Sequence, residues 1–407
     1  MLAKELSRIK LEVFGLSKPF REHQLEAMQA CALGKNIFFV AATGQGKSLV
    51  YQLPSALRPP FVLERRPTIV VSPLKALIHD QLHHLKQLKV KCEALHGGIP
   101  FSAIAGGLSA LDLLFVTPEQ LLSSSDEEYD NPLLARLRTS PPARFVFDEA
   151  HCILHWGNSF RPKYLEAVQS VASEFPQAPI SLLSATAPPT IRQDLGKLFG
   201  DRDMQVFVSQ QLDRPNLSYH LRLKPGSPEA LHDSVVAALR GQECAIVYCV
   251  TKDQVDSLAA VLAKAFPNQV QRYHSGLSPN KRAAGMKLWQ SGLCSIMVAT
   301  NAFGMGVNAS SVRCIIHTAM PLSLTDYIQQ CGRAGRDGLP ATCILHYNVK
   351  GDVVQARKMV AEYDPQELDE MISLCVGKAC VKRVLHAKVT GTEPQDGYCQ
   401  TNCSCRM

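Results

Sequence analysis

The chain lacks an apolar run of the roughly 20 residues that a helix needs to cross a bilayer, although 46% of its 407 residues are hydrophobic. Its first residues, MLAKELSRIKLEVFG, are amphipathic and have no continuous apolar centre of the kind found in secretory signals. We therefore expect no membrane partner and no secretion. Cysteines in such a chain are expected to stay reduced.

A strong charge excess and short-period repeats are absent as well. The formal net charge of +7 permits binding to nucleic acid without requiring it. At 407 residues the chain exceeds the size of one ordinary core. The length therefore predicts two domains and a smaller appendage.

Cysteine is plentiful, with 14 residues. Several of them lie singly within apolar runs, and these are Cys244, Cys249, Cys314 and Cys343. Such cysteines are expected to act as small buried hydrophobic residues. A second group near the C-terminus is dense and polar, and it consists of Cys380, Cys399, Cys403 and Cys405.

Apolar runs, turns and helical segments alternate along both halves of the chain, which is typical of parallel α/β sheets. The strands predicted in the first half are Asn36–Val40, Thr68–Val71, Leu113–Val116, Arg144–Phe147 and Ile180–Leu183. Those of the second half are Cys244–Cys249, Ile296–Ala299, Cys314–Ala319 and Cys343–Tyr347. The sequence thus predicts two α/β lobes, with Ser209–Pro228 as a hinge region between them.

The segment Ala41–Ser48, AATGQGKS, lies between a predicted strand and the helix-compatible run Leu49–Leu57. A glycine turn in this position can surround phosphate with backbone N–H groups, while Lys47 adds a full charge. Ser48 has the hydroxyl that helps to hold Mg²⁺. The predicted ATP-binding residues of this loop are Thr43, Gly44, Gln45, Gly46, Lys47 and Ser48.

A carboxylate pair, Asp148 and Glu149, follows the predicted strand Arg144–Phe147. A strand-end aspartate can hold Mg²⁺, and the neighbouring glutamate can orient and deprotonate the attacking water. We therefore assign Asp148 to the metal and Glu149 to the nucleophile.

Two arginines, Arg333 and Arg336, are spaced by glycines in the second half, in the segment GRAGRDG. This arrangement suits contact with charge that develops on a phosphate. Both are predicted to be catalytic.

Aromatic residues stand in a polar setting just after the carboxylate pair. Trp156 and Phe160 offer flat faces on which single-stranded bases can stack, worth about 1–3 kcal/mol per base. Arg161 adds charge beside them. These three residues are predicted to bind DNA.

Taken together, the motifs resemble superfamily 2 helicases, and specifically the RecQ family of DNA helicases. The resemblance runs from about Phe14 to Cys405. The matching segments are DEAHC with the W-G…F-R-P loop, SPLKALIHDQ (Ser72–Gln81), TPE (Thr117–Glu119), YHSGL (Tyr273–Leu277), ATNAFGMGVN (Ala299–Asn308) and YIQQCGRAGRDG (Tyr327–Gly338).

The resemblance implies two tandem RecA-like parallel-sheet lobes, residues 1–208 and 209–348, that bind ATP and Mg²⁺ in their cleft. It implies a C-terminal helical zinc-binding module, residues 349–407. Arg21 and Gln24 resemble the element that reads adenine, and Ser72 belongs to a segment that contacts the DNA backbone. The residues expected to couple the lobes are His151, Ser184 and Thr186.

The chain departs from the family pattern at several positions. Gln45 replaces a glycine, Gln330 a glutamate, and Asn158-Ser159 a His-Asp pair. Ala319 and Leu322 stand where Asp and Arg are usual. None of these changes removes a predicted catalytic residue, so ATP hydrolysis is expected to survive.

Zinc is predicted to be held by Cys380, Cys399, Cys403 and Cys405, since four thiolates can form a closed tetrahedral site. Their C-x₃-C-x-C spacing differs from the C-x₂-C-x₂-C of the family. Unliganded thiols at the end of the chain are the alternative.

The implied activity is ATP-dependent 3′ to 5′ translocation on single-stranded DNA with unwinding of forked duplexes, in the nucleus of a eukaryote or otherwise in the cytoplasm. Repair or recombination proteins are expected partners. The family often has a winged-helix and a further helical domain, and neither is expected before Met407. The alternatives are a translocase without robust unwinding, a non-motor scaffold, or action on RNA.

Overall fold

The computed structural model describes most of the chain, and it divides into two compact units, Met1–Leu212 and Asp213–Met407. The predicted domain bounds of 1–208, 209–348 and 349–407 stay predictions. Residues outside the description are 43, 63, 74, 98, 100, 105, 123–130, 156–161, 186–188, 201, 210–213, 215, 302, 304–310, 358–364 and 395–407.

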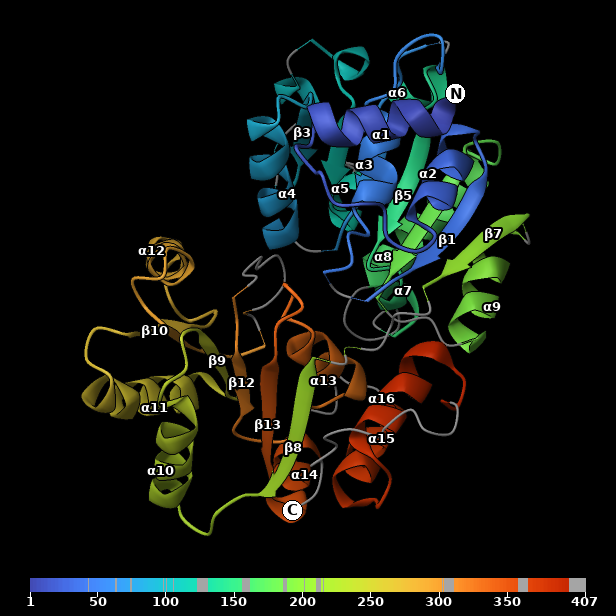
Figure 1. Cartoon of the computed structure of the whole chain (residues 1–407). Helices are drawn as coiled ribbons and strands as arrows, with labels where there is room; N and C mark the ends of the chain where they lie inside the picture. The colour runs from blue at the N-terminus through green and yellow to red at the C-terminus, as the bar shows by residue number, and fades with distance from the viewer. Residues whose placement is uncertain are drawn as a thin grey trace. The chain divides into compact units, whose positions relative to one another are not determined.

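Unit 1 is built on a parallel sheet with the strand order β3-β4-β2-β5-β6-β1-β7 (Figure 1). All five predicted strands are present, and two of them run one residue further, to Asp148 and Ser184. The strands are β1 (Asn36–Val40), β2 (Thr68–Val71), β3 (Cys92–Leu95), β4 (Leu113–Val116), β5 (Arg144–Asp148), β6 (Ile180–Ser184) and β7 (Met204–Val208).

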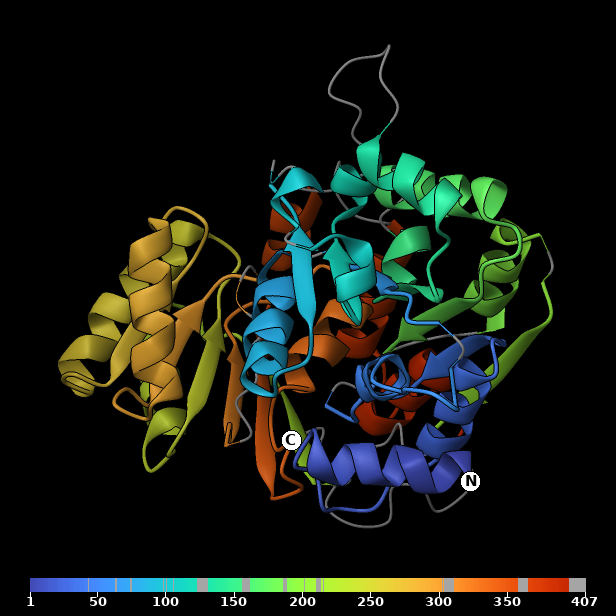
Figure 2. The same ribbon diagram turned by 90° about the horizontal axis from the view of Figure 1, so that it is seen from above.

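Helices cover both faces of this sheet (Figures 1 and 2). Leu6, Met28 and Tyr51, from the first three helices, share one core with strand residues such as Val146. On the other face Phe147 packs against Tyr164. The helices are α1 (Leu2–Glu12), α2 (Gln24–Ala32), α3 (Leu49–Ser55), α4 (Lys75–Gln87), α5 (Pro118–Leu122), α6 (Pro132–Thr139), α7 (His151–His155), α8 (Pro162–Glu174) and α9 (Pro189–Leu198).

Unit 2 has a parallel sheet with the order β10-β11-β9-β12-β13-β8. Its strands are β8 (Leu217–Leu223), β9 (Ala245–Tyr248), β10 (Val270–Tyr273), β11 (Ile296–Ala299), β12 (Cys314–His317) and β13 (Ala341–Tyr347). Its helices are α10 (Pro228–Leu239), α11 (Lys252–Ala265), α12 (Pro279–Gln290), α13 (Leu324–Cys331), α14 (Val349–Arg357), α15 (Pro365–Val376) and α16 (Val381–Thr390).

The predicted hinge region Ser209–Pro228 is wrong in its central part, because Leu217–Leu223 forms β8 and pairs with β13 along its whole length. The error has a physical reason. The sequence LSYHLRL alternates apolar and polar residues between prolines, and its last two residues are exposed on an edge strand.

Local sequence signals account for the starts of several helices in unit 2. Ser227, Ser278 and Ser323 each accept a backbone N–H bond at the first turn of α10, α12 and α13. Thr251 and Gln254 form a reciprocal capping box at the start of α11.

The C-terminal helices α15 and α16 are part of the core of unit 2. Leu368 and Met371 from α15, and Val381 and Leu385 from α16, belong to the same buried cluster as Tyr327 of α13. The predicted helical run Val381–Val389 is confirmed by α16. The described part of this region therefore stabilises the second lobe directly.

The four single cysteines behave as predicted. Cys244, Cys249, Cys314 and Cys343 are buried and take part in no disulfide. Burial raises the pKa of the Cys249 thiol to about 11 and of the Cys314 thiol to about 12. A helix of the length and apolarity needed to cross a membrane does not occur among the described residues.

Candidate active site

Three predicted motifs meet at one edge of the sheet of unit 1. They follow β1, β5 and β6, which are neighbours in the order β5-β6-β1. Because these strands are parallel, their carboxyl ends lie on the same side of the sheet, and ligands bind on that side in such folds. Two backbone hydrogen bonds join the loops there, from Ala41 N–H to the Ser184 carbonyl (3.2 Å) and from Ala150 N–H to the Leu183 carbonyl (2.8 Å).

The phosphate loop has the backbone conformation that its glycines allow. Gly44 and Gly46 have φ angles of 81° and 76°, in the left-handed region. A Cβ atom on Gly46 would lie 2.7 Å from Nε2 of Gln24. A side chain at position 46 would therefore displace Gln24. Thr43, also predicted to bind ATP, lies outside the described residues.

Arg21 and Gln24 contact the phosphate loop itself. Gln24 Nε2 donates to the carbonyls of Gln45 (2.9 Å) and Gly46 (3.3 Å), and its Oε1 accepts from Arg21 N–H (2.8 Å). Arg21 Nη1 donates to the Gly44 carbonyl at 2.8 Å and to the side chain of Gln45. The sequence predicts that both residues bind the nucleotide. The structure shows in addition that they form hydrogen bonds to the backbone of the phosphate loop.

Lys47 and Ser48 lie where the loop enters α3. Lys47 is 8% exposed, and its Nζ donates to the Ala41 carbonyl at 3.2 Å. Ser48 Oγ accepts from Gln81 Nε2 at 3.4 Å, and Gln81 Oε1 accepts from Gln52 Nε2 at 2.6 Å. The sequence analysis did not assign this role to Gln52 or Gln81. The amide of Gln52 within the otherwise largely apolar helix α3 could have indicated it.

The carboxylates of Asp148 and Glu149 differ in their surroundings. Asp148 is 4% exposed, and burial together with the Glu149 charge raises its pKa to about 7, against the opposing charge of Lys47. Glu149 is a non-glycine residue with φ 53°, a strained conformation that is concentrated at functional sites. Its buried Oε2 accepts no hydrogen bond from the described residues and lies 3.5 Å from His151 Nδ1.

His151 and Ser184 are joined directly. His151 Nδ1 and Ser184 Oγ are 3.1 Å apart, and both side chains are buried. The two predicted coupling residues therefore form one contact within unit 1, and the third, Thr186, lies outside the described residues. Tyr164, which the sequence did not indicate, donates its hydroxyl to the Asp148 carbonyl at 2.6 Å.

Asp148→Asn is expected to stabilise the folded protein measured without added Mg²⁺ or nucleotide. The pKa of Asp148 is higher in the folded than in the unfolded protein. The folded protein is therefore most stable below the ordinary pKa of an aspartate, and this stability is lost as the pH rises to about 7. The gain from Asn should thus be small near about pH 4 and approach about 4 kcal/mol near about pH 8.

Thermal unfolding of the two proteins at both pH values measures this effect. Asp194→Asn is the matched control, because Asp194 is 53% exposed in a pair with Lys197. An equal gain at both pH values, or a loss at the higher one, would contradict the raised pKa of Asp148.

The predicted DNA-binding residues are only partly within the description. Trp156, Phe160 and Arg161 lie outside it, between the end of α7 and the start of α8. Ser72 follows β2 and is 1% exposed, and its Oγ finds no hydrogen-bond partner in the described part of the chain. A direct DNA contact of Ser72 thus stays a prediction.

The arginine segment of unit 2 is held by two residues from the region before β8. Arg214 donates to the carbonyls of Gly332 (3.3 Å), Ala334 (2.7 Å) and Gly335 (2.6 Å). Asn216 Nδ2 donates to the Gly335 carbonyl at 2.9 Å, and a Cβ on Gly335 would lie 2.3 Å from this nitrogen. Sequence reasoning missed both residues because they precede the segment by more than a hundred positions.

Arg333 and Arg336 both lie near enough to the buried side chain of Tyr248 for their charges to act on it. Burial raises the pKa of Tyr248, and the charges of the two guanidiniums act in the opposite direction. Arg333 itself is 8% exposed. Both predicted catalytic arginines thus act on the same buried tyrosine of unit 2.

Three departures from the family pattern lie near α13. Gln330 Oε1 lies 2.7 Å from His317 Nε2, and burial lowers the pKa of His317 to about 4. Ala319 and Leu322 line a cavity of about 70 Å³ beside this pair. Asp326 also lines this cavity, so an acidic side chain remains beside the three uncharged replacements.

Of the predicted zinc ligands, the structure describes only Cys380, which is half-buried at the start of α16. Cys399, Cys403 and Cys405 lie outside the described residues. Within the described ranges no group of three or more His, Cys, Asp or Glu side chains is placed to hold a metal ion.

Comparison with family models gives two matches. Residues 21–194 match the model described as DEAD/DEAH box helicase, and residues 227–338 match the model described as helicase conserved C-terminal domain. The first match contains the phosphate loop and the carboxylate pair, and the second contains the arginine segment.

Curated relatives match nearly the whole chain. The chain is 34% identical to ATP-dependent DNA helicase Q-like 4B of Arabidopsis thaliana, over 97% of this chain and 34% of the relative. It is 35% identical to RecQ-like DNA helicase BLM of Xenopus laevis, over 88% and 26%. A putative ATP-dependent DNA helicase Q1 of Caenorhabditis briggsae is 33% identical, over 98% and 64%. The chain thus spans less than two thirds of the length of these relatives.

Solved structures share the fold at lower identity. Helicase Lhr of Mycobacterium smegmatis, bound to single-stranded DNA and AMP-PNP, has a TM-score of 0.65 and 19% identity over 97% of this chain and 56% of its own. The DNA-bound helicase MrfA has a TM-score of 0.67 and 18% identity, over 93% and 54%. Both lobes therefore have the RecA-like helicase fold. With the motifs in place and the relatives named above, this chain belongs to the RecQ family of superfamily 2 helicases.

Proposed function

We propose that the protein is an ATP-dependent DNA helicase that moves 3′ to 5′ along single-stranded DNA and separates duplexes. The observation that carries the proposal is the cluster of Lys47, Asp148 and Glu149 at one edge of the unit 1 sheet. RecQ family membership supports DNA as the substrate, because the relatives named above are DNA helicases.

The residues of this cluster fit Mg²⁺ and a nucleoside triphosphate. Lys47 would neutralise phosphate charge, and Ser48 and Asp148 would hold the ion, which removes the cost of burying the Asp148 carboxylate. Glu149, whose Oε2 accepts no hydrogen bond from described residues, is available to take a proton from the attacking water. Arg333 and Arg336 would contact charge on the transferred phosphate.

DNA binding is proposed for Trp156, Phe160, Arg161 and Ser72. The loop that carries the first three connects α7 to α8. His151 on α7 lies 3.5 Å from Glu149, and Tyr164 on α8 bonds the Asp148 carbonyl. This connection supports the proposal that DNA in the loop affects both carboxylates, with Ser184 and Thr186 in the coupling to unit 2.

The test measures ATP hydrolysis and strand separation together on a duplex with a 3′ single-stranded tail. We expect DNA-stimulated release of phosphate and unwinding, both lost in Lys47→Ala. A 5′-tailed duplex and an RNA oligonucleotide serve as comparison substrates. Hydrolysis without unwinding would indicate a translocase, equal stimulation by RNA would remove the DNA assignment, and no hydrolysis with any oligonucleotide would refute the motor function.

Zinc binding by Cys380, Cys399, Cys403 and Cys405 is proposed on the family resemblance. Metal analysis of the purified protein tests it, because a structural site retains its ion tightly. A nuclear location and partner proteins in repair or recombination are likewise proposed from the family.

A further inference from the structure

A cavity of unit 1 lies at the amino ends of its strands, on the opposite side of the sheet from the candidate active site. Its volume is about 130 Å³. Thr68 and Arg144, the first residues of β2 and β5, form part of its lining. The connection from α3 to β2 supplies Arg58, Arg65 and Arg66. None of the motifs discussed above includes this cavity.

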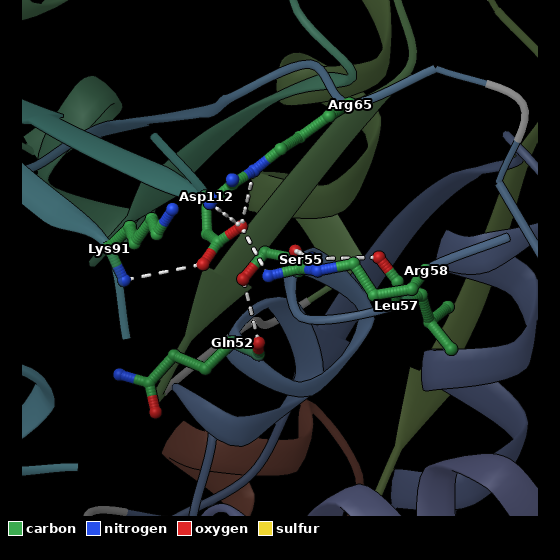
Figure 3. A network of polar contacts seen from close by, with 7 residues as sticks. All are labelled: Gln52, Ser55, Leu57, Arg58, Arg65, Lys91 and Asp112. Carbon is green, nitrogen blue, oxygen red and sulfur yellow. Dashed lines mark hydrogen bonds and ion pairs between the residues drawn. The ribbon is translucent and has the colours of Figure 1, made fainter. Parts of the chain in front are cut away.

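Arg58 and Arg65 converge on a single oxygen atom (Figure 3). Asp112 Oδ1 accepts from Arg58 Nη2 at 2.9 Å, and from Arg65 Nε and Nη2 at 3.1 and 2.9 Å. The other carboxylate oxygen accepts from Lys91 N–H at 3.3 Å. Asp112 is 3% exposed, and both of its carboxylate oxygens accept hydrogen bonds from neighbouring residues.

The positive charge around the cavity exceeds the negative charge. Arg58 and Arg65 share the one carboxylate of Asp112, while Arg66 has its own partner in Glu64 at 2.7 Å. The cluster of three arginines therefore keeps an excess positive charge next to the open space.

Arg144 adds a buried charge without a carboxylate. It is 4% exposed and donates to neutral acceptors, which are Ile180 O, Ser181 Oγ, Cys31 O and Lys35 O, at 2.7–2.9 Å. Among the residues that the structure describes, no acidic side chain accepts from it. Burial lowers the pKa of its guanidinium, so the charge is held at a cost in free energy.

A purely structural role explains only part of this arrangement. Asp112 and one arginine would suffice to fix the α3–β2 connection to the sheet. That role leaves three features open: the second guanidinium on the same oxygen, the charge of Arg144 that its neutral acceptors do not balance, and the cavity that these arginines line. An anion in the cavity would account for all three, because guanidinium groups bind oxyanions with paired N–H donors.

We propose that this cavity binds a small tetrahedral oxyanion of the phosphate type, held by Arg58 and Arg65, with Arg66 and Arg144 contributing charge. The volume of about 130 Å³ compares with roughly 10–15 Å³ for one water on the same kind of measure. It admits an ion of this size. The proposal does not depend on the helicase function proposed above.

Calorimetric titration with inorganic phosphate tests the site, at constant ionic strength and against chloride as the reference anion. The whole chain is used with Lys47→Ala, since the phosphate loop is a second place for phosphate in the parent protein. We expect saturable binding of one equivalent. Arg65→Gln should weaken it at least tenfold, and Arg136→Gln, an exposed arginine of α6 that contacts its own helix, should leave it unchanged.

A second variant removes the risk that Arg65→Gln destabilises the fold by leaving Asp112 with fewer partners. The triple change Arg58→Gln, Arg65→Gln and Asp112→Asn removes the cations and the carboxylate together, and it should abolish saturable binding while thermal unfolding remains cooperative. Three results would overturn the proposal: no saturable binding in the starting protein, unchanged affinity in the triple variant, or an Arg136→Gln effect equal to that of Arg65→Gln. Displacement of phosphate by single-stranded DNA that requires Arg65 would also overturn the small-anion assignment.

Discussion

Glu149→Gln is expected to lower the DNA-stimulated rate of ATP hydrolysis by about 10²–10⁴-fold, the range for loss of a positioned general base. The amide keeps the size of the side chain but cannot accept a proton from water. The Oε2 atom of Glu149 accepts no hydrogen bond from the described part of the chain, so the substitution removes no such bond there. ATP affinity should therefore change little.

Steady-state hydrolysis and binding of a fluorescent ATP analogue separate the two effects. Lys47→Ala should lose both, because its charge acts on the phosphates in the ground state and in the transition state. Glu166→Gln is the matched control, since Glu166 is 45% exposed in a pair with Lys163 on α8. A Glu149→Gln protein that hydrolyses ATP at more than about a tenth of the normal rate would show that another group acts as the base.

The central strands could be predicted from the sequence because their residues are buried on both faces and form continuous apolar runs. Strands β1, β2, β4 and β11 match the predicted bounds, whereas β3, β7, β8 and β10 were missed. All four missed strands are at the edges of their sheets. Edge strands need fewer apolar residues, as the half-exposed residues of β7 and β10 show, and their sequences resemble loops.

The phosphate loop and the carboxylate pair were predictable because strand, glycine turn and acidic residues are adjacent in the sequence. The supporting contacts were not. Arg214 and Asn216 bind backbone carbonyls of the arginine segment, and Tyr164 binds the carbonyl of Asp148. Any residue type can supply a backbone carbonyl oxygen, so the sequence contains no pattern that predicts these hydrogen bonds.

A large loss of stability is expected from Glu367→Ala, in a buried ion pair that joins the C-terminal helices to α13. Glu367 accepts from Lys388 Nζ at 2.7 Å, and from Thr325 N–H and Oγ1 at 3.3 and 3.2 Å. The side chains of Glu367 and Lys388 are 6% and 14% exposed. Burial acts to lower the pKa of Lys388, but Glu367 and Glu370 raise it above its ordinary value.

Removal of one partner leaves a buried cation and takes the acceptor from Thr325 N–H and Oγ1, and loss of one partner of a buried pair typically costs about 3–5 kcal/mol. Glu370 remains as a second acceptor for Lys388 at 2.5 Å, so we expect the lower end of this range, about 3 kcal/mol. Glu370→Gln is the control, because Glu370 is 33% exposed and its loss should cost less than about 1 kcal/mol.

Thermal unfolding followed by circular dichroism measures both changes, and Glu367→Leu with Lys388→Met tests the cause. Replacing a buried ion pair by apolar residues of similar volume is often neutral, so the double variant should regain most of the stability that Glu367→Ala loses. A loss in Glu367→Ala no greater than in Glu370→Gln would mean that α15 and α16 are attached to unit 2 by their apolar contacts alone. Since α13 leads directly into Arg333, the same substitution should also lower the hydrolysis rate more than the control does.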